Sequence, residues 1–105
     1  MAMTMTQKIL AKHAGLDAVV AGQLIEAKLV VMANDITGPM ALPIFHQMAD
    51  KVFDKDKVIL VPDHFTPNKD IKSAENSKAI LDFSNDQCLT HHMEQGKCGV
   101  EHAIL

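Results

Sequence analysis

The sequence predicts an α/β fold, with a mostly parallel sheet and flanking helices, from three observations. Two short runs of apolar and β-branched residues, 27–33 and 58–61, are typical of strands buried on both faces. Segments with the apolar spacing of helices follow each run. Polar residues stand directly after both runs. The order strand, helix, strand, helix, strand is typical of parallel sheets with right-handed crossovers.

A short first helix is expected near the N-terminus, before the strand at 27–33. Thr4 or Thr6 can cap its start, and Gly15 supplies its stop. Four of its residues are spaced to share one buried stripe: Ile9, Leu10, His13 and Ala14.

A second helix is expected after the turn at 37–39, with Pro43 in its first turn or at a kink. Its predicted buried stripe contains Met40, Ile44, Phe45 and Met48. The charged segment 50–57 then leads to the strand at 58–61, which ends where Pro62, Asp63 and His64 begin.

Residues 70–85 have a third helical pattern, with four outward charged side chains at Lys72, Glu75, Lys78 and Asp82. Its apolar positions are Ile71, Ala74, Ala79, Ile80 and Phe83. A strand at 89–93, a turn at 95–99 and an apolar end at 100–105 complete the expected elements.

Length and composition limit the organisation and the partners. A chain of 105 residues is expected to form a single domain, residues 1–105. A net charge of −3 and the absence of arginine disfavour nucleic-acid binding. Polar residues and prolines interrupt the most apolar stretch, 29–49, so no membrane span is expected. Two cysteines and no apolar leader indicate a cytoplasmic protein.

The loop 63–70 is the first candidate site, because it follows a strand and gathers carboxylate, imidazole, amide, hydroxyl and ammonium groups. Ligands of parallel sheets meet the carboxyl ends of the strands. A carboxylate such as Asp63 can fix the tautomer of His64 and raise its pKa, which suits proton transfer near neutral pH. The alternative is a solvated turn in which Asp63 caps a helix and His64 has no role.

Asn34 and His102 are weaker candidates for functional residues. Asn34 follows the first strand and can bind a substrate, or it can satisfy its own turn. His102 stands among apolar residues, where a histidine is more often a core residue than a catalyst. A zinc site is disfavoured by ligand spacing, because neighbouring histidines in a strand point to opposite faces. Its candidate ligands are Cys88, His91, His92 and Cys98.

Four sequence blocks resemble the N-terminal part of the large subunit of 3-isopropylmalate dehydratases, in the aconitase superfamily. The blocks are TQKILA at 6–11, ANDITGP at 33–39, VPDHFTPNKDIK at 61–72 and GVEHAIL at 99–105. The resemblance implies a partial α/β domain of an aconitase-type iron-sulfur protein. It also implies a hydro-lyase of leucine biosynthesis that interconverts 2- and 3-isopropylmalate by removing and re-adding water, with a 4Fe-4S cluster as Lewis acid.

The resemblance also implies roles for four residues. His64 corresponds to the proton donor to the departing hydroxyl, and Asp63 to the residue that orients it. His102 corresponds to a histidine near the cluster and its water, and Asn34 to an amide that contacts substrate. The family holds its cluster with a Ser-His-Thr-Cys segment and a later Cys-x-x-Cys pair, and neither motif occurs in this sequence. No metal ligand is therefore assigned here, and two thiolates are too few for a cluster.

We therefore expect a truncated piece that is inactive by itself and self-associates through an unpaired sheet edge and an apolar face. Its expected partners are the remainder of the large subunit, the small subunit and a small 2-hydroxy acid substrate. Two alternatives remain open: a segment of a homoaconitate hydratase of lysine biosynthesis, and a noncatalytic binding or assembly module on the same scaffold.

Overall fold

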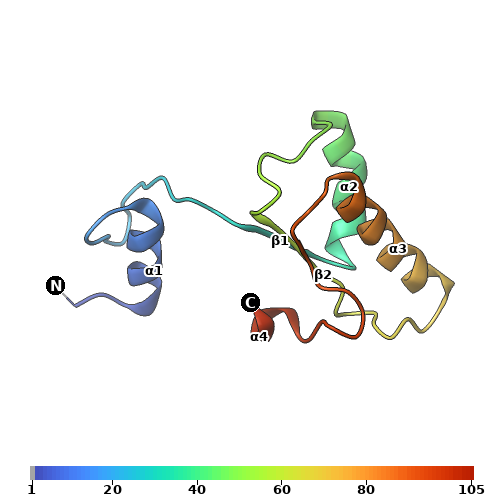
Figure 1. Cartoon of the computed structure of the whole chain (residues 1–105). Coiled ribbons are helices and arrows are strands. Elements are labelled where there is room, and N and C mark those ends of the chain that lie inside the picture. The colour runs from blue at the N-terminus through green and yellow to red at the C-terminus, as the bar shows by residue number, and fades with distance from the viewer. Residues whose placement is uncertain (1) are drawn as a thin grey trace.

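The computed structural model describes residues 2–105 and contains a three-stranded parallel sheet with helices around it (Figure 1). The elements in chain order are α1 (Met5–Ala14), β1 (Val31–Asn34), α2 (Thr37–Met48), β2 (Val58–Val61), α3 (Ile71–Asp86), β3 (His91–His92) and α4 (Glu101–Ile104). The predicted α/β fold class is confirmed.

The strands lie in the order β1-β2-β3, and both neighbouring pairs are parallel. Val31 pairs with Val58, and Ile59 pairs with His91. The strands predicted at 27–33 and 89–93 are shorter than expected, because β1 and β3 pair only where β2 lies beside them. Val31 and Met32 point to opposite faces and are 47% and 36% exposed, so the prediction that this strand is covered on both faces is wrong.

The helices α2 and α3 lie side by side and pack against the sheet (Figure 1). The rings of Phe45 and Phe83 meet edge to face, with their centroids 5.3 Å apart. The buried core consists of Val58, Leu60 and Ile80. Beside it, an apolar cavity of about 230 Å³ lies between β1, β2 and the two helices.

The buried side of α2 differs from the predicted stripe. Phe45 is half-buried, but Met40, Ile44 and Met48 are 73%, 60% and 81% exposed. Gly38 is buried, and a Cβ atom there would lie 3.1 Å from Ile80 Cδ1. The close approach at Gly38 turns a different side of the helix toward the core than the apolar spacing indicated.

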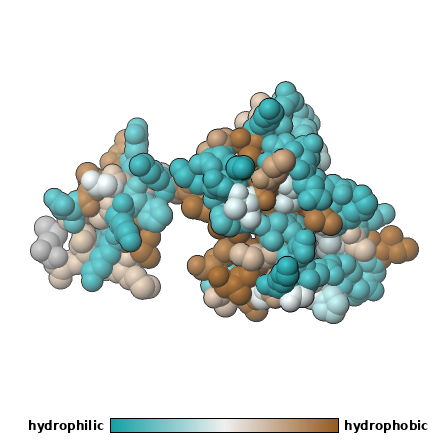
Figure 2. Space-filling view, viewed as in Figure 1, coloured by the Kyte–Doolittle hydropathy of each residue, from teal (hydrophilic) through white to brown (hydrophobic). Residues whose placement is uncertain are grey.

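The helix α1 begins with a capping box between Thr4 and Gln7 and ends at Gly15, whose φ is 69°. Both predicted boundary signals, Thr4 and Gly15, are confirmed. The predicted buried stripe is wrong, because Ile9 is 54% and Leu10 39% exposed. Figures 1 and 2 show why: α1 lies apart from the sheet, joined to it by a narrow neck of chain.

The whole chain is correspondingly elongated. Its radius of gyration is 16.5 Å, whereas a compact domain of this length has a radius of about 13 Å.

In the C-terminal half, Asp70 caps α3 by accepting a hydrogen bond from the Ser73 N–H at 2.8 Å. The predicted outward charges of α3 are exposed and Ile80 is buried, but Ile71 at its first turn is 80% exposed. A turn at 95–97 falls within the predicted one. The apolar end contains the single turn of α4. Among residues 2–105, no helix is both long and apolar enough to cross a membrane.

Candidate functional site

The candidate site lies at the carboxyl ends of β1 and β2. Asn34 pairs with Val61 at the last position of the two strands, so the residues that follow them leave the sheet at the same edge. Asp35 directly follows β1, and a single residue, Pro62, separates β2 from Asp63 and His64. The geometry therefore brings two segments 29 residues apart into hydrogen-bond contact.

Asp35 holds the loop after β2 in place. Its side chain is completely buried and accepts hydrogen bonds from two backbone N–H groups, those of His64 at 3.1 Å and Phe65 at 2.7 Å. A buried carboxylate requires such donors. Because one of them belongs to His64, Asp35 fixes the backbone of the predicted proton donor.

Asp63 and His64 form a hydrogen-bonded pair. Nδ1 of His64 lies 2.7 Å from Oδ1 of Asp63 and 3.7 Å from Oδ1 of Asp35. An ionised carboxylate is an acceptor only, so the His64 Nδ1–H donates and Nε2 is left for other contacts. The side chain of Asp63 is 10% exposed and that of His64 is 41% exposed, so the imidazole remains open to solvent in this chain.

In this pair, the pKa of His64 is raised above its ordinary value of 6.5, and the pKa of Asp63 is lowered below its ordinary value of 3.8. The hydrogen bond to Asp63 is the main cause of the raised pKa of His64. Partial desolvation acts to lower this pKa, but the negative charges of Asp63, Glu101 and Asp35 raise it further. Desolvation by burial acts to raise the pKa of Asp63, but the hydrogen bonds from the Glu101 N–H and from His64 outweigh it and lower the pKa overall. The protonated imidazole and ionised carboxylate stabilise each other.

Glu101 links the C-terminal segment to this pair. Its backbone N–H donates a hydrogen bond to Oδ2 of Asp63 at 2.9 Å, at the start of α4. Its carboxylate Oε1 accepts from Asn34 Nδ2 at 3.4 Å and lies 3.3 Å from Nε2 of His102. The predicted site residues His64 and His102 are thereby connected through Asp63 and Glu101.

Asn34 is largely committed to its own turn. Its Oδ1 accepts hydrogen bonds from the N–H groups of Ile36 and Thr37, both at 2.9 Å, and from the Thr37 hydroxyl at 3.0 Å. The residue is 9% exposed, and its amide nitrogen contacts Glu101. These contacts are those of the alternative in which the asparagine satisfies a turn. A substrate contact at Asn34 stays a prediction.

The structure brings all four predicted residues to one corner of the sheet, but it does not bury them equally. Asn34 and Asp63 are inside the network, whereas the His102 side chain is 78% exposed. Asp63 also accepts the N–H of Glu101, the first residue of α4, whereas the helix that follows its own loop, α3, is capped by Asp70. Their chemical roles stay predictions.

Two members of the network were missed by sequence reasoning. Asp35 has the same signal as Asn34, a polar residue directly after a strand, but that signal does not show that its carboxylate turns inward to the loop after β2. Glu101 had no signal, because its burial depends on a contact with Asp63, 38 residues away.

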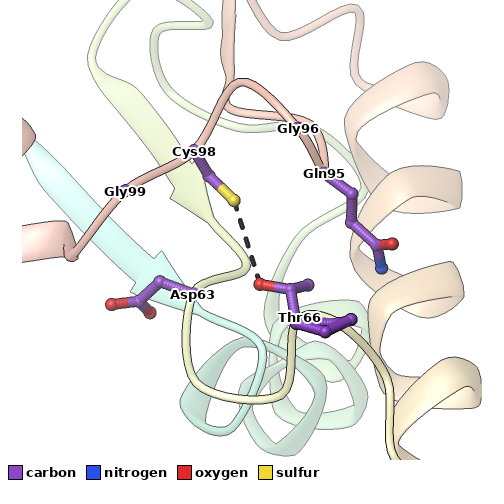
Figure 3. Close-up of a pocket in the computed structure, with 7 residues that line it drawn as sticks. Asp63, Thr66, Gln95, Gly96, Cys98 and Gly99 are labelled. Carbon is purple, nitrogen blue, oxygen red and sulfur yellow. Dashed lines mark hydrogen bonds between the residues drawn. The ribbon is translucent and has the colours of Figure 1, made fainter.

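A neighbouring cavity of about 400 Å³ lies between the loop after β2 and the turn at 95–97 (Figure 3). Cys98 Sγ lies 3.8 Å from the Thr66 hydroxyl oxygen and 3.7 Å from the Pro62 carbonyl oxygen. Figure 3 shows the Asp63 carboxylate directed away from both Cys98 and Thr66. The Cys98 thiol therefore lies outside the hydrogen-bond network of the site.

The residues described do not fit an iron-sulfur cluster by themselves. Cys88 follows α3 and is exposed. Cys98 comes after β3 in the sequence, and its thiol lies beside Thr66. A 4Fe-4S cluster, the type that the family resemblance implies, normally takes at least three thiolates. The potential ligand atoms within 4.8 Å of one another in the described part of the chain belong to Asp35, Asp63 and His64, and both Asp35 oxygens already accept backbone hydrogen bonds.

No family model matches the chain, but it is similar along its whole length to curated proteins. It is 60% identical to the 3-isopropylmalate dehydratase large subunits of Lachnoclostridium phytofermentans and Desulfitobacterium hafniense, covering 100% of this chain and 25% of each relative. It is 59% identical to the 2,3-dimethylmalate dehydratase large subunit of Eubacterium barkeri, of which it covers 26%.

The chain thus spans about a quarter of the length of the relatives it matches. Chance similarity does not extend over a whole chain at this identity. Along its full length, the chain is similar to a segment of 3-isopropylmalate dehydratase large subunits, which confirms the resemblance indicated by its four sequence blocks.

Proposed function

We propose that this chain is a segment of a hydro-lyase that interconverts 2- and 3-isopropylmalate by dehydration and rehydration, in leucine biosynthesis. The observation that carries the proposal is the hydrogen-bonded Asp63–His64 pair at the carboxyl ends of two parallel strands. The names of relatives that are 60% identical along the whole chain support the reaction class.

In this proposal His64 is the general acid. Removing water from a 2-hydroxy acid requires a proton for the departing hydroxyl, because hydroxide is a poor leaving group. With Nδ1 donating to Asp63, the second ring nitrogen, Nε2, is the atom that delivers the proton. Asp63 orients the ring and stabilises its protonated form. Asn34 is proposed to contact substrate and His102 to act near the reacting hydroxyl.

The proposal assigns the remaining machinery to other polypeptide. A 4Fe-4S cluster would supply Lewis acidity in the complete enzyme, but the two cysteines of this chain do not fit it. The proposed partners are the remainder of the large subunit, the small subunit and the small 2-hydroxy acid substrate. Residues 1–105 are then one partial α/β domain of an aconitase-type iron-sulfur protein, and the proposed location is the cytoplasm.

A second candidate substrate is 2,3-dimethylmalate. It is favoured by the Eubacterium barkeri relative, which matches this chain at 59% identity. Both candidates are alkyl-substituted malates, so the same proton transfer serves either one. Competition assays with the two acids separate them.

The experiment tests His64 in a complete large subunit that contains this chain, assembled with its small subunit. His64→Ala is expected to lower turnover of isopropylmalate by about 10²- to 10⁴-fold, the usual contribution of a general acid. His91→Ala is the matched control, because His91 is exposed on β3 and outside the network. Near-normal turnover of the His64 variant removes the proposed role.

A separate measurement addresses the cluster. Iron and acid-labile sulfide are quantified in the purified 105-residue chain after anaerobic reconstitution. Substoichiometric amounts are expected, since too few thiolates are present. Stoichiometric binding of both contradicts the assignment of the cluster ligands to other polypeptide. A chain that binds no cluster and supports no turnover in the assembled enzyme favours a noncatalytic module.

A further inference from the structure

Glu101 is the residue at which the contacts of the site converge. It is 5% exposed, although it is a glutamate in a four-residue helix four positions from Leu105. Charged residues are rarely buried unless they are paired. Its burial therefore requires contacts that compensate for the loss of water.

The contacts of Glu101 reach all three segments of the site. Its backbone N–H donates to Asp63 Oδ2 at 2.9 Å, while the other oxygen of Asp63 contacts His64. Its Oε1 accepts from Asn34 Nδ2 at 3.4 Å and lies 3.3 Å from His102 Nε2. One residue thus contacts the end of β1, the loop after β2 and the exposed imidazole of α4.

The second carboxylate oxygen of Glu101 is different. Its Oε2 is buried and, within the described residues, has no hydrogen-bond partner. A side chain retained only to stabilise the fold would be expected to satisfy both oxygens, because a buried unpaired acceptor is costly. Glu101 is therefore held by its Oε1 and backbone contacts rather than by complete pairing of its carboxylate.

We propose that Glu101 is a positioning residue, which fixes Asp63, Asn34 and His102 relative to one another and adds a third carboxylate, after those of Asp63 and Asp35, to the surroundings of His64. The importance of this third carboxylate rests on the proposed function, in which His64 must be protonated to act as a general acid. Glu101 itself is not proposed to touch the substrate.

The charges around His64 indicate how large the effect of Glu101 can be. Asp63 lies beside the ring at 2.7 Å and Asp35, from the end of β1, at 3.7 Å, while Glu101 acts from α4. The His102 imidazole lies on the same helix, with its Nε2 3.3 Å from Oε1 of Glu101. Asp63 dominates, so the contribution of Glu101 is a part of the raised pKa of His64 rather than its main cause.

The test is a titration of the histidine ring protons by NMR in the 105-residue chain, with Glu101→Gln. Glutamine keeps the backbone N–H and an oxygen that accepts from Asn34, but it removes the charge. The pKa of His64 is expected to fall by about half a pH unit, as for one charge acting through partly hydrated space. Glu75→Gln is the matched control, because Glu75 is exposed on α3. An unchanged His64 pKa, or an equal fall in the control, overturns the proposal.

A second variant covers the case in which Glu101→Gln does not fold. Glu101→Asp keeps the charge and the backbone N–H but shortens the reach to Asn34 and His102. The pKa of His64 is expected to remain raised, while the ring signals of His102 change because its contact with the Glu101 carboxylate is lost. A His64 pKa at the ordinary value in a folded Glu101→Asp variant overturns the proposal.

A pH profile of the assembled enzyme separates this proposal from the proposed function. Activity that depends on a protonated His64 falls as the pH rises through its pKa, and Glu101→Gln is expected to move that fall to lower pH by about half a pH unit. An active enzyme whose alkaline limb does not move removes the role of Glu101 alone. An enzyme that is active with His64→Ala removes the proposed function, whereas the NMR result for Glu101 stands.

Discussion

Asp63 and Glu101, 38 residues apart in the sequence, are joined by a hydrogen bond of 2.9 Å from the Glu101 backbone N–H to Asp63 Oδ2. This contact attaches α4 to the end of β2 and brings His102 to the same corner as His64. Because the other oxygen of Asp63 contacts His64 at 2.7 Å, one carboxylate both orders the C-terminal segment and prepares the imidazole. Changes at Asp63 should therefore affect both the attachment of α4 and the pKa of His64.

Asp63→Asn should lower the pKa of His64 toward its ordinary value of 6.5, because the main cause of the raised pKa is the hydrogen bond to the carboxylate. Histidine ring signals followed by NMR against pH give the measurement. Asp50→Asn, at an exposed position, is the control and should leave His64 unchanged. A His64 pKa that stays raised without the carboxylate contradicts the prediction.

Asp35→Ala should destabilise the fold by about 2 to 4 kcal/mol, because it leaves two backbone N–H groups without their acceptor. Those groups belong to His64 and Phe65, and Asp35 is completely buried. Urea unfolding followed by circular dichroism measures the loss. Asp50→Ala serves as the exposed control and is expected to change the free energy of unfolding by less than about 0.5 kcal/mol.

The stability of the chain should depend on pH on both sides of 6.5. The raised pKa of His64 gives a stabilisation that is complete below pH 6.5 and is lost as the pH rises through the higher folded-state value. The pKa of His92 is lowered by desolvation, so its contribution is present above pH 6.5 and is lost as the pH falls. Urea midpoints measured across this range should show His64→Gln flattening the alkaline side and His92→Gln the acidic side.

Gly38→Ala should force Ile80 to shift by a few tenths of an ångström, and we expect the overpacking of α2 on α3 to outweigh the roughly 1 kcal/mol that alanine gains over glycine in a helix, so that the net change is destabilising. The added Cβ atom would lie 3.1 Å from Ile80 Cδ1 and 3.3 Å from Ile80 Cγ1. Ile80→Val removes Cδ1, so in a double-mutant cycle the pair should cost less than the sum of the single changes. Strict additivity in urea unfolding would show that the two positions do not meet.

Self-association of the chain should decrease with Val30→Lys. Val30 is 52% exposed and directly precedes β1, which is an edge strand with no neighbour on its outer side in the described part of the chain. A lysine at such an edge opposes pairing with a second copy. Sedimentation velocity should show a shift toward monomer. Leu24→Lys, at a position that is 97% exposed and seven residues before β1, adds the same charge outside the strand edge and should have less effect.

Apolar side chains also gather around the C-terminal end of the part of the chain that contains the sheet (Figure 2). Val100 and Leu105 are 67% and 54% exposed there. Single changes at the β1 edge should therefore reduce association without abolishing it, if both surfaces contribute.

The sequence by itself determined the order of strands and helices and the stop of α1 at Gly15, and it limited the cap of that helix to Thr4 or Thr6, because these features depend on neighbouring residues. It also indicated Asp63 and His64, because polar residues after a buried strand lie where ligands meet a parallel sheet. The similarity of the blocks to dehydratase large subunits was likewise a property of the sequence.

Tertiary structure alone decided which faces are buried and which polar groups meet. Met40 and Ile44 have helical spacing, yet they are exposed because Gly38 brings the other side of α2 against Ile80. The burial of Asp35 and Glu101 depends on hydrogen bonds to residues that are 29 to 38 positions away. Local pattern does not specify such contacts, because they form only when separate strand ends and loops are brought to one edge of the sheet.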